Sequence, residues 1–154
     1  MSFFEKSALM DTFRILPHLA TLATAYVLAV PIGWDREKAK RSAGLRTFPL
    51  VAIAACGFVR AAESAFETHP ESLARVLQGV IIGIGFIGGG AIVKHGTSVH
   101  GTATAASLWA TGGVGMAVSL GAYDVAVVIS AFTFATLHFL RPHVHEEEPE
   151  NMTG

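Results

Sequence analysis

Charged side chains are scarce in this sequence. Only 15% of its 154 residues are Asp, Glu, Lys or Arg, whereas soluble domains contain about 25%. Apolar residues make up 51%, and the mean hydropathy is +0.49. So few charges cannot cover a water-facing surface, and the surface is therefore expected to face lipid. A buried helical soluble protein is the alternative, but its outer helices would need polar faces, and the apolar stretches show none.

The sequence also has no excess of positive or negative charge, and it has only one cysteine. Eleven Lys and Arg oppose twelve Asp and Glu, which gives a formal charge of -1 and no basic field for nucleic acid. The single cysteine, Cys56, cannot form an internal disulfide or a zinc cluster. No HExxH, GxSxG or Walker motif is present. We therefore expect no nucleic-acid partner, no enzymatic activity and no bound cofactor.

Long charge-free stretches are what the sequence does contain. A membrane-spanning helix needs about 20 apolar residues, so the first, third and fourth stretches are long enough, and the second and fifth are marginal. The second reaches the far interface either if Arg60 snorkels, or if the helix continues toward Phe66 with Arg60 and Glu63 paired at i,i+3. The expected fold class is all-α, a polytopic membrane bundle of about five transmembrane helices with a glycine-rich third helix. The five stretches are 15–34, 47–59, 76–93, 95–123 and 125–140.

The distribution of Lys and Arg predicts the orientation. Residues 15–141 are expected to form the transmembrane domain, followed by a flexible acidic and histidine-rich tail 142–154. The N-terminal segment 1–14 is either a short interfacial helix or a frayed terminus. Short cytoplasmic loops are enriched in Lys and Arg. The first loop and the C-terminus are therefore predicted to be cytoplasmic, with the N-terminus outside. Seven of the eleven Lys and Arg share that side: Arg36, Lys38, Lys40, Arg41, Arg46, Lys94 and Arg141.

The third stretch is rich in glycine. Each glycine costs a helix about 1 kcal/mol relative to alanine, so another interaction must offset this cost. Either the glycines form small-residue faces for close helix packing, or the last three interrupt the helix and expose its backbone to an ion or a partner. The residues assigned to this packing or partner face are Gln78, Gly79, Gly83, Gly85, Gly88, Gly89 and Gly90, with Thr102, Thr104 and Trp109 of the fourth stretch.

The densest group of charges lies where the first stretch ends. Asp35, Arg36 and Glu37 follow it, and Arg46 and Thr47 open the second stretch. We expect Asp35 or Glu37 to pair with Arg46. Residues at i and i+2 point apart on a helix, but Mg²⁺ accepts one or two carboxylates together with retained waters. The group is thus a candidate ion site with Asp35 and Glu37 as metal ligands, and an ion-paired cytoplasmic anchor is the alternative.

Three segments resemble the MgtC/SapB family of bacterial inner-membrane proteins. The family's acidic-Arg-Glu motif falls on residues 35–37, its GLRT motif on 44–47, its GIGF motif on 83–86 and its TAAxLW motif on 104–109. His100 stands where the family often has Arg, and Thr102 and Ala103 stand where it often has Leu-Thr. The chain resembles the shorter, SapB-like members, which lack a soluble C-terminal domain. The segments are GWDREKAKRSAGLRTFPLVA (33–52), QGVIIGIGFIGGGAIV (78–93) and VHGTATAASLWATGGVGMAVSLGAY (99–123).

The resemblance implies a five-helix domain of the bacterial inner membrane. The family is linked to growth in low magnesium, to survival inside host cells and to restraint of the F-type ATP synthase. The resemblance therefore favours a role in magnesium homeostasis, as a transporter or transport-associated protein with magnesium as ligand or substrate. The alternative is a regulatory module that modulates another membrane complex, such as the ATP synthase, without transport. The expected partners are membrane lipid and either a second copy or another membrane protein.

Overall fold

A computed structural model of the chain describes residues 15–66, 69–95 and 98–140. The expectations for the N-terminal segment 1–14 and the tail 142–154 lie outside these residues. The five expected helices are confirmed, and the antiparallel pair of short strands replaces an expected loop. The elements in chain order are α2 (Ile15–Lys38), α3 (Thr47–Ala65), α4 (Pro70–Gly90), β1 (Val93–His95), β2 (Ser98–His100), α5 (Thr102–Ser119) and α6 (Tyr123–Phe139).

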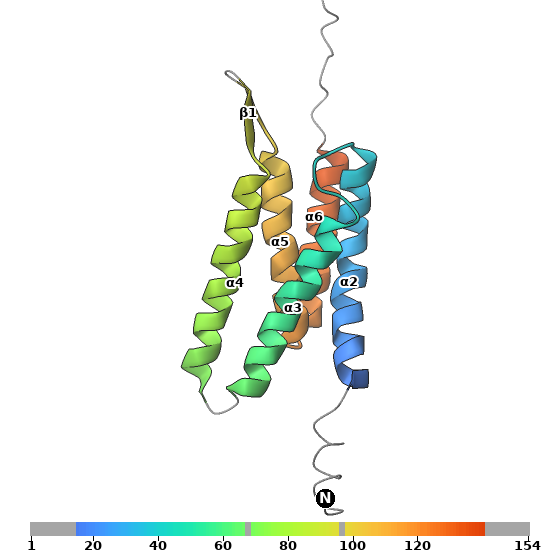
Figure 1. Cartoon of the computed structure of the whole chain (residues 1–154). Helices are drawn as coiled ribbons and strands as arrows, with labels where there is room; N and C mark the ends of the chain where they lie inside the picture. Colours follow the sequence, from blue (N-terminus) through green and yellow to red (C-terminus); the bar gives the residue numbers. More distant parts are fainter. Residues whose placement is uncertain (1–14, 67–68, 96–97, 141–154) are drawn as a thin grey trace, which may run out of the picture.

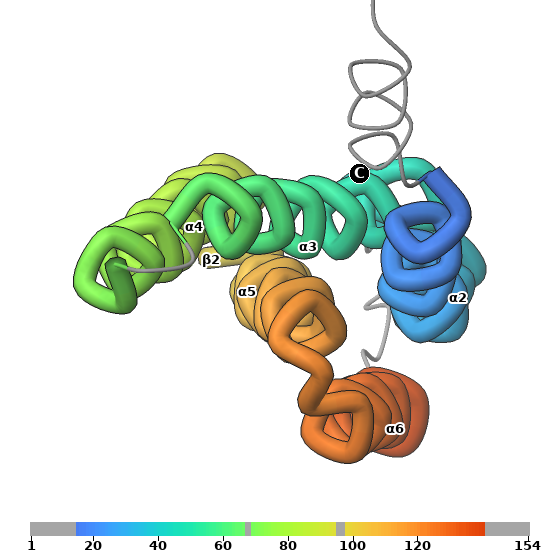
Figure 2. Tube along the Cα trace, turned by 90° about the horizontal axis from the view of Figure 1, so that it is seen from below, coloured from blue at the N-terminus to red at the C-terminus, as the bar shows by residue number. Residues whose placement is uncertain are grey.

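The helices run alternately up and down. The loop between α2 and α3, the β1–β2 hairpin and the last turn of α6 all lie at one end of the bundle (Figure 1). Seen along the helices, α2, α3 and α4 form one row, and α5 and α6 lie on one side of it (Figure 2). The first loop and the end of the last helix therefore share one end, which we call the charged end of the bundle.

Turn residues in the sequence fix where the helices begin. The amides of Thr47 and Phe48 donate to the carbonyl of Gly44 at 3.0 and 3.2 Å. Pro70 opens α4, a position where its missing amide hydrogen costs no helical hydrogen bond. Gly101 turns the chain from β2 into α5 with φ +90°. A side chain there would collide with the backbone of Ala91, so this turn requires glycine.

Helix lengths decide which segments suit a membrane. Helices α2, α3 and α4 are long and apolar enough to span one. The continuation of the second stretch to Ala65 is confirmed, and Arg60 Nη1 lies 3.3 Å from Glu63 Oε2. The fourth stretch exceeds one span, and its first residues lie outside the helix as expected, in the hairpin, so that α5 has 18 residues, many of them Thr, Ser and Gly. Helix α6 has 17 residues, about 26 Å.

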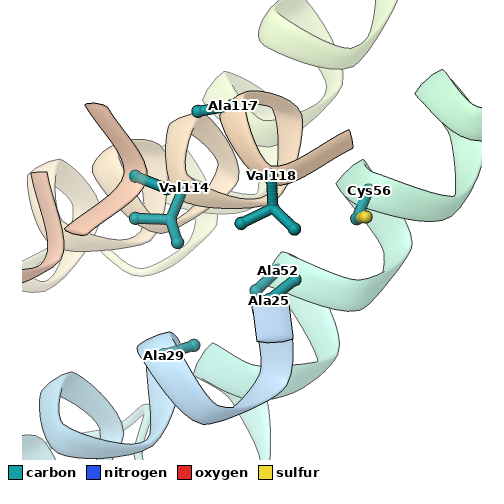
Figure 3. Packing of buried hydrophobic residues seen from close by; sticks show 8 residues of the cluster. Ala25, Ala29, Ala52, Cys56, Val114, Ala117 and Val118 are labelled. Carbon is teal, nitrogen blue, oxygen red and sulfur yellow. The ribbon is translucent and has the colours of Figure 1, made fainter. Parts of the chain in front are cut away.

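Small side chains form the centre of the bundle. One buried cluster joins four helices almost entirely through Ala, Val and Cys side chains (Figure 3). On α5, Gly115 lies so close to the Ala52 carbonyl of α3 that a side chain would collide with it. Such residues let helix backbones approach closely, which is how helices pack in lipid. The cluster comprises Ala25, Ala29, Ala52, Cys56, Val114, Ala117, Val118 and Ala126.

Helix α4 lies at one end of the row and contributes little to the buried interior. Only Ile84 and Gly88 of this helix are buried. The helix is continuous through Gly88 and Gly89 and ends at Gly90, which favours close packing over an interruption within the helix. Gly88 packs against α5, where a Cβ would lie 3.2 Å from the Ala105 carbonyl oxygen.

Candidate functional site at the charged end of the bundle

Asp35 and Arg36 form a buried ion pair at the end of α2. Arg36 Nη2 lies 2.8 Å from Asp35 Oδ2, and the two side chains are 6% and 1% exposed. The same nitrogen donates to the Leu137 carbonyl of α6 at 3.3 Å. A buried charge is costly unless it is paired and hydrogen-bonded. Each member of this pair therefore depends on the other for its place in the bundle.

His138 on α6 is a member of this group that the sequence did not single out. Its Nδ1 atom lies 3.1 Å from Asp35 Oδ1, and its side chain is 48% exposed. Its ring stacks on Phe134, with a centroid distance of 5.4 Å. A lone histidine in an apolar stretch is usually a packed residue, and no spacing in the sequence connects it to Asp35. The available signal was its position in the last turn of α6, level with the charges of the first loop.

Glu37 and Arg46 do not form the expected ion pair. Glu37 Oε2 accepts a hydrogen bond from the Leu45 amide at 3.1 Å. Within the described part of the chain, the Arg ion pair of Asp35 is made by Arg36, and Arg46 pairs with neither acid. The expectation was wrong because α2 continues to Lys38, which directs Asp35 inward and Glu37 toward the loop. Glu37 thereby holds the turn that precedes α3.

The same geometry bears on the candidate metal ligands. Asp35 points toward α6, where it meets His138, whereas Glu37 meets the loop at Leu45. Among residues 15–66, 69–95 and 98–140, no group of three or more His, Cys, Asp or Glu side chains is arranged to hold a metal ion. Magnesium binding at Asp35 and Glu37 stays a prediction.

A cavity of about 490 Å³ adjoins the ion pair, and we call it the polar cavity because six of its twelve lining residues have polar side chains. It lies between the ends of α2, α5 and α6, and Arg36 and Leu137 form part of its wall. Both candidate threonines of the fourth stretch line this cavity: Thr104 is 2% exposed, and Thr102 is exposed. The sequence predicted neither the cavity nor its lining, because the cavity combines the ends of three helices that are distant in the chain.

The glycines of α4 lie on two different faces. Gly79 and Gly83 line a groove between α3 and α4, whereas Gly85 and Gly89 do not line it, consistent with the 100° rotation per helical residue. A Cβ added at any of these four positions would meet nothing within 4 Å. Three further residues assigned to this face, Gln78, Gly90 and Trp109, are exposed.

The groove between α3 and α4 is the larger cavity, with a volume of about 970 Å³. Its walls are almost entirely apolar, with Leu50 and Phe58 from α3 and Ile87 from α4. Arg46 and Thr47 border it at the charged end. Some of the candidate residues thus gather at two places, Arg36, Thr102 and Thr104 at the polar cavity and Arg46, Thr47, Gly79 and Gly83 along the apolar groove, whereas Gly85 and Gly89 line neither.

Five apolar helices with small residues at their interfaces define a polytopic helical membrane protein. The model of the MgtC family matches residues 22–146, and the chain belongs to this family.

Curated relatives agree with the family match. Protein MgtC of Salmonella typhimurium is 35% identical over 131 residues, covering 85% of this chain and 55% of the relative. Protein MgtC of Brucella abortus is 40% identical over 141 residues, covering 91% of this chain and 58% of the relative. The chain thus spans a little over half the length of these relatives. No solved structure matches it.

Proposed function

We propose that this chain is a regulatory module of the bacterial inner membrane that binds a helix of another membrane protein in the groove between α3 and α4. The groove itself carries the proposal. It is apolar, about 970 Å³ in volume and lined by Gly79 and Gly83, and neither glycine has a neighbour within 4 Å of the position of a Cβ. A helix backbone can approach such a surface closely.

The composition of α4 supports binding of a helix over simple contact with lipid. A helix surface that only contacts lipid chains can carry Leu or Ile. Glycine there needs a separate reason, because each glycine costs a helix about 1 kcal/mol relative to alanine. Gly88 offsets its cost by packing against Ala105 of α5, but Gly79 and Gly83 have no such contact within the described chain. A helix seated in the groove would supply the missing contact.

The test is capture of partners from bacterial membranes with the tagged chain and its Gly83→Leu variant. A leucine at this position would fill the groove, and we expect loss of the captured membrane protein. Gly85→Leu is the matched control, because it makes the same change on the same helix outside the groove. The F-type ATP synthase, to which the family resemblance points, is the first complex to assay, together with a differently tagged second copy of this chain.

The two variants give distinct outcomes. Loss of the partner in Gly83→Leu alone places the partner in the groove. Equal capture by both variants and the native chain would overturn the proposal and leave the groove to lipid. Loss in Gly85→Leu alone would move the interface to the outer face of α4.

Magnesium-linked transport is the second proposal, and the buried carboxylate of Asp35 supports it. Ionisable residues inside membrane helices commonly mark ion pathways, and Asp35 is 4% exposed. Its test is magnesium entry into proteoliposomes that hold the purified chain and a trapped indicator. We expect flux in the native chain and none in Asp35→Asn/Arg36→Gln, which removes both charges of the pair. Absence of flux from folded native protein would exclude transport by this chain alone.

A further inference from the structure

We propose that the polar cavity between the ends of α2, α5 and α6 binds a phosphate group. Its volume of about 490 Å³ is within the usual range of small-ligand sites. It lies at the charged end of the bundle and shares no lining residue with the groove between α3 and α4. The proposal is independent of the function proposed above.

Arg36 provides the first reason. The guanidinium group has five N–H donors, and its hydrogen bonds within the described chain both come from Nη2, to Asp35 and to the Leu137 carbonyl. Its Nε atom is buried without a hydrogen-bond partner. Buried donors are nearly always satisfied. A side chain that is 6% exposed, lines a cavity and retains unused donors therefore points to an acceptor that belongs in the cavity.

The N-terminus of α5 provides the second reason. Thr102, Ala103 and Thr104 form its first turn and line the cavity. No side chain caps this helix. In the described residues, the first backbone hydrogen bond of α5 runs from the Ala105 amide to the Gly101 carbonyl, at 2.8 Å. Within the part of the chain that the structure describes, the first three amides of the helix have no backbone acceptor. An uncapped helix N-terminus favours an anion through these amides and the helix dipole.

The charges around the cavity favour the same class of ligand. Arg41 and His100 line it with Arg36, and no Asp or Glu is part of its described lining. Asp35 neutralises part of the Arg36 charge but does not line the cavity. Guanidinium groups, a hydroxyl and helix amides are donors that match phosphate oxygens. This phosphate belongs either to a lipid headgroup at the membrane surface or to a soluble phosphate compound.

The experiment measures thermal unfolding of the purified full chain in detergent with two probes. Inorganic phosphate is compared with chloride at equal ionic strength, and phosphatidic acid is compared with diacylglycerol of the same chain length. A probe that binds the folded state raises the unfolding temperature. A rise with phosphatidic acid alone assigns the site to a lipid headgroup. A rise with inorganic phosphate assigns it to a soluble compound.

Variants test whether the binding occurs in this cavity. Arg41 is exposed, so Arg41→Gln should fold normally. It should raise the midpoint concentration of the active probe about tenfold, as expected for loss of one charge-assisted contact. Thr104→Val keeps the shape of the side chain and should raise this midpoint concentration about fivefold. Arg46→Gln makes the same charge change at the other end of the same loop and should match the native chain. The proposal is overturned if neither probe raises the unfolding temperature, or if Arg41→Gln and Thr104→Val respond as the native chain does.

Discussion

The Nδ1 atom of His138 lies 3.1 Å from the Oδ1 atom of Asp35, although the two residues are 103 positions apart. This contact, with the Arg36 hydrogen bond to the Leu137 carbonyl, joins the end of α2 to the end of α6. The first and last described helices are therefore held together by polar groups at the charged end. Elsewhere in the bundle the helices meet through apolar side chains, which are small in one cluster and include Phe48, Ile84 and Leu108 in the other.

The buried ion pair should control stability. Asp35→Asn leaves the Arg36 charge without its carboxylate in a place where the side chain is 6% exposed. We expect the free energy of unfolding to fall by about 3–5 kcal/mol, because removing one member of a buried pair leaves an uncompensated charge. Unfolding of the purified chain in mixed detergent and dodecyl sulfate micelles measures this change.

The control for this prediction is the double variant Asp35→Asn/Arg36→Gln. Because it removes both charges, it should lose less stability than the sum of the two single variants. Additive losses would show that the two charges do not stabilise each other.

The helices themselves were largely predictable from the spacing of charges. Charge-free stretches gave the five helices, because a charge inside lipid is expensive. The i,i+3 spacing correctly predicted the contact of Arg60 with Glu63 and the continuation of α3 beyond Val59. Each of these features depends on interactions between residues that are close in the sequence.

The features that the sequence left open depend on contacts between distant segments. Nothing local distinguishes His138 from a packed histidine, and its contact with Asp35 exists only because α6 returns beside α2. The Arg46 pairing failed for a local reason, since α2 continues to Lys38 and the adjacent Arg36 pairs with the Asp35 carboxylate. The β1–β2 hairpin was missed because its residues have no strong alternation of apolar and polar side chains.

The two glycines Gly113 and Gly115 of α5 should respond oppositely to alanine. A Cβ at Gly115 would collide with the Ala52 carbonyl of α3, whereas a Cβ at Gly113 would meet only Ile129 Cδ1, at 3.9 Å. Gly115→Ala should destabilise the chain by about 1–3 kcal/mol because backbone must move. Gly113→Ala should stabilise it by up to about 1 kcal/mol through helix propensity. Similar unfolding curves for both variants would show that α5 does not pack closely on α3.

The hydroxyl of Ser130 links α6 to α2, and this link should contribute to stability. Its Oγ donates to the Leu28 carbonyl at 2.6 Å, and Ser130 is 6% exposed. Ser130→Ala should reduce the free energy of unfolding by about 1 kcal/mol. Thr24→Val is the control, because the Thr24 hydroxyl bonds only within α2, to the Ala20 carbonyl. An equal loss in both variants would contradict a specific role for the link between helices.

The orientation in the membrane should follow the positive charges. The α2–α3 loop carries Lys40 and Arg41, and such loops remain in the cytoplasm. In a Cys56→Ala background, which removes the one native cysteine, Ser42→Cys should resist a membrane-impermeant maleimide applied to intact spheroplasts and react after lysis. Ser64→Cys, exposed near the opposite end of α3, should react before lysis. The reverse pattern would invert the topology and place the polar cavity with the charged end outside the cell, where the cytoplasmic supply of soluble phosphate compounds does not reach.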